Sequence, residues 1–179
     1  MQPTVILGVD PGFHVTGYAI SSIEDRKVLL RDCGFLKMNP QHHLSKRVGQ
    51  FYNFMSDKIA TYHVTSLALE TSFLGKNAQT FLKLGYLRGI LYLLADQNNL
   101  SLAEFAPREI KMATTGFGGA SKEQVAAMML RLFPRLTEFG AIEKADVTDA
   151  LAICLCGVWH HQRQSMLGAL AGSRQSASQ

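Results

Sequence analysis

The chain has 179 residues, of which 47% are hydrophobic and 18% charged, with a formal net charge of +4. This is the composition of one globular domain with a substantial core, and no apolar run is long enough to cross a bilayer. Its cysteines, Cys33, Cys154 and Cys156, are odd in number and two lie in an apolar segment, which argues against a disulfide framework or a zinc site.

The N-terminal residues contain no basic region followed by an apolar stretch, so no secretory leader is expected. Together with three thiols that read as small buried side chains, this indicates a cytoplasmic protein. The basic balance is compatible with a polyanionic partner but does not by itself demonstrate one.

The first forty residues predict three strands that pair as an antiparallel meander. The first is almost entirely apolar, as in a strand covered on both faces, and Pro11-Gly12 makes the turn that follows it. The three predicted strands cover residues 4–9, 14–21 and 27–37.

Helices and strands then alternate. Apolar residues at helical spacing predict a helix over 43–62, and a second, longer helix is expected over 77–97. Short strands follow each of them, at 66–70 and 101–106.

The C-terminal part predicts three further helices. Pro107 opens a short one, a glycine-rich loop covers 114–120, and Ser121 caps the next, which runs to residue 133. A last helix is expected over 146–160, and the Ser-, Gln- and Gly-rich segment 161–179 reads as a disordered tail.

Three strands followed by strand–helix alternation give an α/β fold with a mixed five-stranded sheet. The first three strands would be antiparallel, the last two parallel, and helices would cover both faces. The prediction is therefore one domain over residues 1–160.

Acidic residues stand where strands end. Asp10 ends the first strand and Glu70 the fourth, and ligands collect at the carboxyl ends of parallel strands. Asp146 and Asp149 are three apart, so on a helix they share a face, and the apolar residues after them would draw that helix onto the core.

Each acid also has an ordinary structural interpretation. An aspartate before Pro-Gly is usually a turn former, Glu70 could be an exposed strand end, and Asp146 and Asp149 could cap a helix. Taken together these readings weaken, because several converging carboxylates without an interleaved Lys or Arg repel one another and need a cation. Oxygen ligands select Mg²⁺ or Mn²⁺, and two such ions are the usual apparatus for phosphodiester displacement.

Four motifs resemble the bacterial RuvC family of Holliday-junction resolvases, within the RNase H-like nuclease and integrase superfamily. They are GVDPGFHVTGYAI, LETSFLGKNAQTFLKLGYLRG, FAPREIKMATTGFGGASKEQV and ADVTDALAIC, in the family's order and spacing. The resemblance covers roughly residues 4 to 160. It implies an RNase H-like fold and a metal-dependent endonuclease in which Asp10, Glu70, Asp146 and Asp149 are the catalytic carboxylates.

The resemblance implies two Mg²⁺ ions per site, with Mn²⁺ as a possible substitute. Asp10 would bridge both ions, while the roles of the other three acids stay open. It also implies a homodimer that nicks two opposed strands of a four-way DNA junction symmetrically, and cooperation with the RuvA–RuvB branch-migration complex.

Basic and aromatic residues near the acids are candidates for holding DNA, although lysines on helix faces are most often simply solvated. Lys111 and Lys122 match family positions implicated in DNA binding, and Lys122 also opens a helix. Phe73 matches an aromatic thought to stack on an unpaired junction base. The full set of candidates is Phe73, Lys76, Lys83, Arg88, Arg108, Lys111, Phe117 and Lys122. His14 could shuttle protons near Asp10, but reads more naturally as a strand histidine.

The chain departs from the family pattern at two places. Gly85-Tyr86-Leu87-Arg88-Gly89 replaces Gly-Gln-Ala-Arg-Gly, and the loop around Phe117 lacks the polar and Arg residues often found there. These changes bear on DNA affinity rather than on the carboxylates. Gly85 and Gly89 permit close approach of another backbone, and burial against the chain's own sheet accounts for much of the apolar face of the 77–97 helix. The family resemblance implies that this helix also forms part of the dimer interface.

Three other functions share part of this sequence pattern. Actin-like ATPases and sugar kinases also open with strand–Asp–x–Gly, but they need two duplicated domains. A non-catalytic scaffold that binds branched DNA would gain nothing from acids facing phosphates. Another RNase H-like nuclease, acting on RNA–DNA hybrid, remains an alternative.

Overall fold

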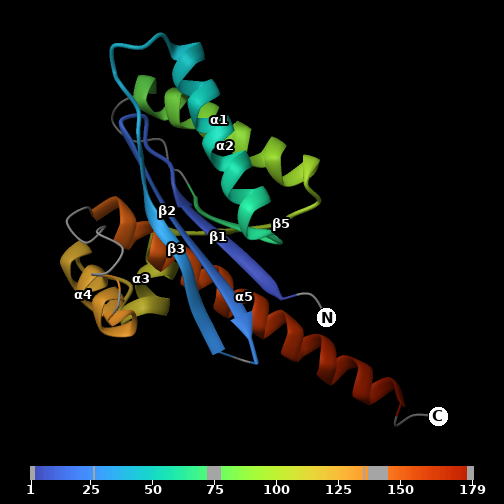
Figure 1. Ribbon diagram of the computed structural model, residues 1–179. Coiled ribbons are helices and arrows are strands. Elements are labelled where there is room, and N and C mark those ends of the chain that lie inside the picture. The colour runs from blue at the N-terminus through green and yellow to red at the C-terminus, as the bar shows by residue number, and fades with distance from the viewer. Residues whose placement is uncertain (1–2, 26, 72–77, 135, 137–144, 177–179) are drawn as a thin grey trace.

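The computed structural model describes residues 3–25, 27–71, 78–134, 136 and 145–176 of the chain. Five strands form one mixed sheet in the order β3-β2-β1-β4-β5 (Figure 1). The strands are β1 (Thr4–Asp10), β2 (Val15–Glu24), β3 (Lys27–Lys37), β4 (Ser66–Glu70) and β5 (Ser101–Phe105). The helices are α1 (Leu44–Tyr62), α2 (Ala78–Gln97), α3 (Pro107–Thr115), α4 (Lys122–Leu132) and α5 (Ala145–Ser176).

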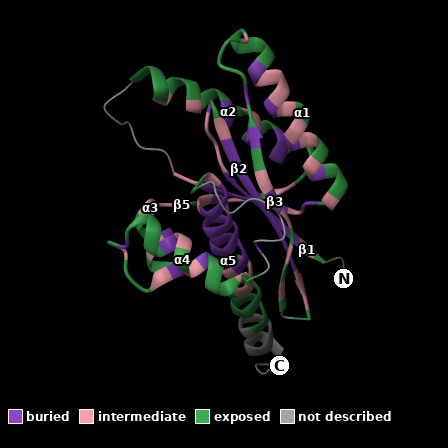
Figure 2. Ribbon diagram, turned by 60° about the vertical axis from the view of Figure 1, so that its left-hand side comes forward, coloured by how far each residue is buried: buried purple, intermediate pink, exposed green. Residues whose placement is uncertain are grey.

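The predicted topology of the sheet is confirmed. β1 pairs antiparallel with β2 and β2 with β3, while β4 runs parallel to β1, and β5 parallel to β4. Helices cover both faces, with α1 and α2 on one side and α3, α4 and α5 on the other (Figures 1 and 2).

Alternation along the strands divides the core in two. Val5, Leu7 and Val9 of β1 pack with α1 and α2, whereas Ile6 belongs to the cluster formed with α5. Successive strand residues point to opposite faces, so the parity of a position decides which helices its side chain meets.

The first half of α5 lies directly on the backbone of β1 and β2. A Cβ added at Gly8 would come within 2.5 Å of the Cys154 nitrogen, and one at Gly17 within 1.9 Å of the Asp146 carbonyl oxygen. Glycine at these positions therefore sets how closely the helix approaches the sheet. The cysteines are free and buried, as expected.

The predicted tail is wrong for most of its length, because α5 continues without a break to Ser176. Gln, Arg, Met, Leu and Ala dominate residues 162–171 and favour a helix once the packed half has nucleated it, and the reading by overall composition missed this. The end of α5 projects beyond the sheet (Figure 1). Within the described residues, no helix is both long and apolar enough to traverse a membrane.

Candidate active site

Asp10 and Glu70 end neighbouring parallel strands on the same face of the sheet. The register pairs Val9 of β1 with Leu69 of β4, one residue before each acid. Val9 and Leu69 both pack toward α1 and α2. Since side chains alternate, both carboxylates emerge on the opposite face, which α5 covers.

The beginning of α5 brings the other two acids to this place. In the β1–β2 register Asp10 lies opposite Gly17, and the backbone of Asp146 rests on Gly17. Asp149 follows one turn later on the same face of the helix. All four acidic residues are half-buried, so the fold does not leave them in bulk solvent.

The acids line two hollows at this end of the sheet. Asp10 and Asp146 lie in one of about 520 Å³, and Glu70 and Asp149 in a smaller one of about 70 Å³. Lys111 and Lys122 line the smaller hollow, while His14 and Lys83 line the larger one.

Mutual repulsion and burial raise the pKa of two of the acids. The pKa of Asp10 rises to about 7, chiefly through burial and then through the charges of Asp149, Glu70 and Asp146. Burial and the charge of Asp149 also raise the pKa of Glu70, against the opposing charges of Lys122 and Lys111. The carboxylates are therefore close enough for their charges to interact electrostatically.

The four acids converge at one end of the sheet without forming a ready metal cluster. In the part of the chain that the structure describes, no three His, Cys, Asp or Glu side chains come close enough together to hold a metal ion. The Lys122 ammonium instead lies 2.7 Å from Oδ2 of Asp149. The donor chemistry nonetheless fits a hard divalent cation, because all four groups offer carboxylate oxygens. Burial, together with the charges of neighbouring acids, raises the pKa of Asp10 and of Glu70.

The candidate DNA-binding residues fall in different places. Lys83, Lys111 and Lys122 line the two acidic hollows, and Phe117 is exposed in the loop before α4. Arg108 lines a separate hollow behind α3. Phe73 and Lys76 lie outside the described residues.

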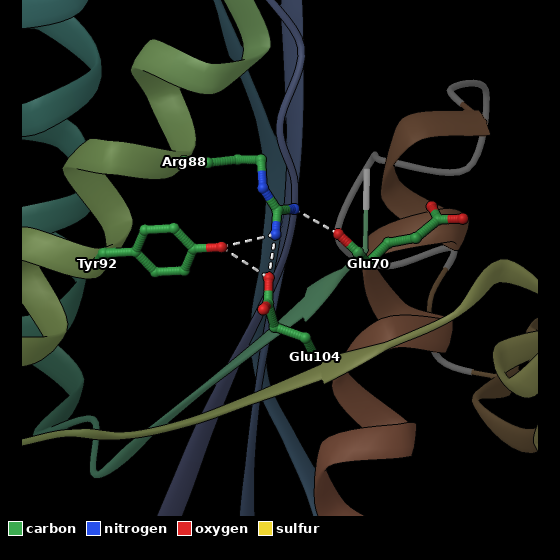
Figure 3. Close-up of polar contacts among 4 residues, drawn as sticks. All are labelled: Glu70, Arg88, Tyr92 and Glu104. Atoms are coloured by element: carbon green, nitrogen blue, oxygen red, sulfur yellow. Dashed lines mark hydrogen bonds and ion pairs between the residues drawn. The ribbon is translucent and has the colours of Figure 1, made fainter. Parts of the chain in front are cut away.

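Arg88 is not available for a phosphate, contrary to the prediction. It is buried, and its guanidinium donates to the backbone carbonyl of Glu70 at 2.5 Å, to the Tyr92 hydroxyl at 2.9 Å, and to the carboxylate of Glu104 (Figure 3). The Tyr92 hydroxyl also donates to that carboxylate, at 2.8 Å. The Glu70 carboxylate points away from Arg88 (Figure 3), so Arg88 fixes the backbone of Glu70 from α2 while leaving the side chain unbound.

Two further residues hold the turn after Asp10, and sequence reasoning missed both. The Thr16 hydroxyl donates to the Gly12 carbonyl oxygen at 2.9 Å and accepts from the Gly12 nitrogen at 3.2 Å. Arg47 of α1 is buried, stacks over the Phe13 ring and donates to the Phe13 carbonyl oxygen. The sequence did contain one indication that Arg47 is buried, because it lies four residues before Phe51 on the buried stripe of α1.

The chain is similar to known proteins over most of its length. Residues 6–157 match the family model "Crossover junction endodeoxyribonuclease RuvC". A protein of that name from Pelodictyon phaeoclathratiforme is 45% identical over 152 residues, which cover 85% of this chain and 78% of the relative.

Solved structures share the fold. The RuvC structure from Thermus thermophilus superposes with a TM-score of 0.76 at 24% identity, over 90% of this chain and 97% of that one. The T. thermophilus RuvC in complex with Holliday junction substrate gives a TM-score of 0.75 at 22% identity, over 89% and 96%.

Proposed function

The chain belongs to the RuvC family of crossover junction endodeoxyribonucleases, and from this premise we propose that it resolves four-way DNA junctions by nicking two opposed strands symmetrically. The observation that carries the proposal is the convergence of four half-buried acids from β1, β4 and α5 at one end of the sheet. Basic side chains line the same hollows, as a site for a polyanion requires.

Family membership implies dependence on a divalent metal ion, and we assign its ligands to Asp10, Glu70, Asp146 and Asp149. Two Mg²⁺ ions, which Mn²⁺ could replace, suit these oxygen donors. When bound, such ions neutralise the charge that develops on the phosphate and lower the pKa of the attacking water. The chain's own contribution is to place Asp10 among the other three acids, where it can serve both ions, and to hold the Glu70 backbone through Arg88.

Lys122 would have two alternative partners. Its ammonium bonds to Asp149, yet its side chain is 72% exposed at the start of α4, where backbone N–H groups also favour an anion. If Asp149 held a cation, the Lys122 ammonium would be free to contact the phosphate backbone. Lys83, Lys111 and Phe117 would make further contacts with DNA.

Replacing Lys122 tests the phosphate contact. We expect Lys122→Ala to weaken binding to a four-way junction and to reduce the slope of log K against log[salt] by about one unit, because one phosphate contact is lost. Lys27→Ala, at the opposite end of the sheet, is the matched control and should leave the slope unchanged. An equal effect of both substitutions would exclude a specific contact by Lys122.

A symmetric cut calls for a symmetric protein, and α2 offers the surface for a homodimer. Leu82, Tyr86 and Leu93 are exposed along one side of this helix. Gly85 and Gly89 lie on the same side, and an added Cβ would meet no atom within 4 Å at either position. A second copy could therefore approach closely here. Cooperation with RuvA–RuvB is expected from the family, and a cytoplasmic location is expected from the buried thiols and the N-terminal residues.

The decisive experiment compares substrates. The protein is incubated with a four-way junction, linear duplex of the same sequence and RNA–DNA hybrid, each with and without Mg²⁺. We expect paired nicks in the junction only, and only with metal. Cleavage of the hybrid would favour another RNase H-like activity, and tight junction binding without any cleavage would favour a non-catalytic scaffold.

A further inference from the structure

A hollow of about 600 Å³ lies behind α3, on the side away from the candidate active site. Helix α3 separates this hollow from the smaller acidic one. Pro107, Ile110 and Lys111 of α3 line the acidic hollow that contains Glu70. Arg108, Glu109 and Met112 of the same helix line the hollow behind it. The helix Pro107–Thr115 therefore presents one face to the acids and another to a space that the nuclease reaction does not use.

The floor of this hollow is apolar. Phe105 at the end of β5, Met112 of α3 and Cys156 and Trp159 of α5 contribute to it. The Met112 side chain is half-exposed beside Phe105 and Trp159, which line the same hollow. The apolar surface continues from the floor of the hollow along α5. Met166 and Leu167 are 66% and 54% exposed there, on the side of the helix that carries Trp159 and Arg163.

The rim of the hollow is cationic. Arg108 and Arg163 stand on opposite walls, and among the described residues neither guanidinium has an ion-pair partner. One acid lines the hollow, Glu109, and its carboxylate accepts a hydrogen bond from the Ala106 nitrogen at 2.6 Å. An apolar floor between two unpaired arginines is the pattern of a site for an apolar side chain flanked by carboxylates.

We propose that this hollow is a docking site for a partner protein that presents a short acidic segment with an apolar anchor such as Phe or Leu. Duplex DNA would satisfy the arginines but brings no apolar group for the floor, because its bases are stacked inside the helix. The chain's own C-terminal segment does not fit either, since residues 164–179 contain no Asp or Glu. The proposal does not depend on the nuclease activity.

The molecule carries its own reporter for this site, because Trp159 is the one tryptophan in the sequence. The full-length protein is titrated with a blocked hexapeptide, Glu-Asp-Leu-Phe-Asp-Glu, while tryptophan emission is recorded. We expect a saturable change with a dissociation constant on the order of 100 µM or tighter. Two control peptides replace Leu-Phe by Ser-Ser, or the four acids by lysines, and neither should bind.

Charge reversal sharpens the test. Arg163→Glu should weaken binding of the acidic peptide at least tenfold and create binding of the lysine peptide, while junction cleavage is unchanged. Met112→Ser should weaken the acidic peptide without changing its salt dependence.

Two results would overturn the proposal. One is the absence of any tryptophan response to the acidic peptide, or an equal response to the serine control. The other is a tryptophan response to junction DNA that Arg163→Glu abolishes together with DNA affinity, which would make this face part of the nucleic-acid surface. Failure of the nuclease assignment would instead appear as an inactive protein with normal peptide binding.

Discussion

At Asp10 the chain places a carboxylate at the end of a strand whose preceding residues are buried. Burial and three neighbouring acids raise its pKa to about 7 from the ordinary 3.8. The folded protein therefore holds a proton on Asp10 at pH values where the unfolded chain has released it. Under the linkage relation, stability then falls as the pH rises from about 4 to about 7 and stays at its lower level above that.

Asp10→Asn should remove this loss of stability, because the amide mimics the protonated acid. With metal chelated, we expect the variant to exceed the parent in free energy of unfolding by up to about 4 kcal/mol at pH 8, and the two to converge toward pH 4. Urea unfolding across this pH range measures the difference. A constant difference at all pH values would show that Asp10 is not the titrating group. The variant should bind junctions but fail to cut them.

The positions of the acids could be predicted from single residues, but their partners could not. Asp10 and Glu70 stand at strand ends in the sequence, and the structure places both on the face that α5 covers. Arg88 looks like any helix arginine, and its contact with Glu104 depends on how α2 lies over β5, which no local pattern encodes. Arg47 was missed for the same reason.

At the scale of elements, Arg88 ties α2 to the ends of β4 and β5. The Arg88 guanidinium donates hydrogen bonds to Glu70, Tyr92 and Glu104 at the same time. The single ammonium of a lysine cannot reproduce this planar arrangement of donors.

Arg88→Lys should therefore leave buried acceptors unpaired, lower stability by about 2 kcal/mol and lower kcat by roughly tenfold or more. Arg131→Lys, in the exposed last turn of α4, is the matched control and should change neither. Single-turnover cleavage and thermal unfolding, measured on both variants, separate the two effects. Unchanged kcat in Arg88→Lys would show that the Glu70 backbone needs no such support.

The seat of α5 on the sheet is the second feature at this scale. A methyl group at Gly17 would collide with the Asp146 backbone, so Gly17→Ala should displace the start of α5, cost about 1–3 kcal/mol and abolish cleavage. Gly49→Ala in α1 meets no atom within 4 Å and should instead stabilise the protein by about 0.5–1 kcal/mol. Chemical denaturation of both variants provides the comparison. A Gly17→Ala protein as stable and active as its parent would contradict this account of α5.

Local sequence patterns predicted most of the helices and strands, but not the second half of α5. The five strands and the helices before α5 lie close to their predicted positions because apolar periodicity, caps and turns all agree. The second half of α5 lacks the apolar periodicity that predicts a packed helix, because its residues 163–169 are exposed. Its composition resembles that of a linker. Its helical form comes instead from propensity and from continuity with the packed half.

For the whole molecule, the order of strands and helices in the sequence was enough to predict the mixed sheet, because alternation of strands and helices forces parallel crossovers. What the sequence did not predict is the separation of the four acids, because no three of them lie close enough together to hold an ion. Side-chain positions at that precision depend on local charge balance, here on the pairing of Lys122 with Asp149.

The proposed dimer can be tested at this scale through the outer side of α2. Leu82→Glu places charge in the apolar stripe, so we expect a monomer by sedimentation equilibrium and uncoupled, single-strand nicks in a cruciform plasmid. Leu132→Glu, on the similarly exposed surface of α4, should leave both properties unchanged. If the parent and the Leu82→Glu variant sediment alike, another surface must join the two copies.

The arrival of Asp146 and Asp149 on α5 has a consequence for biosynthesis. The sheet and the first two acids come from the first 105 residues, whereas the other two lie on α5, which follows α3 and α4 in the chain. A nascent chain can thus form its sheet long before it holds a complete set of acids. Until α5 has been synthesised and has packed on the sheet, we expect the nascent chain to be unable to cleave nucleic acid.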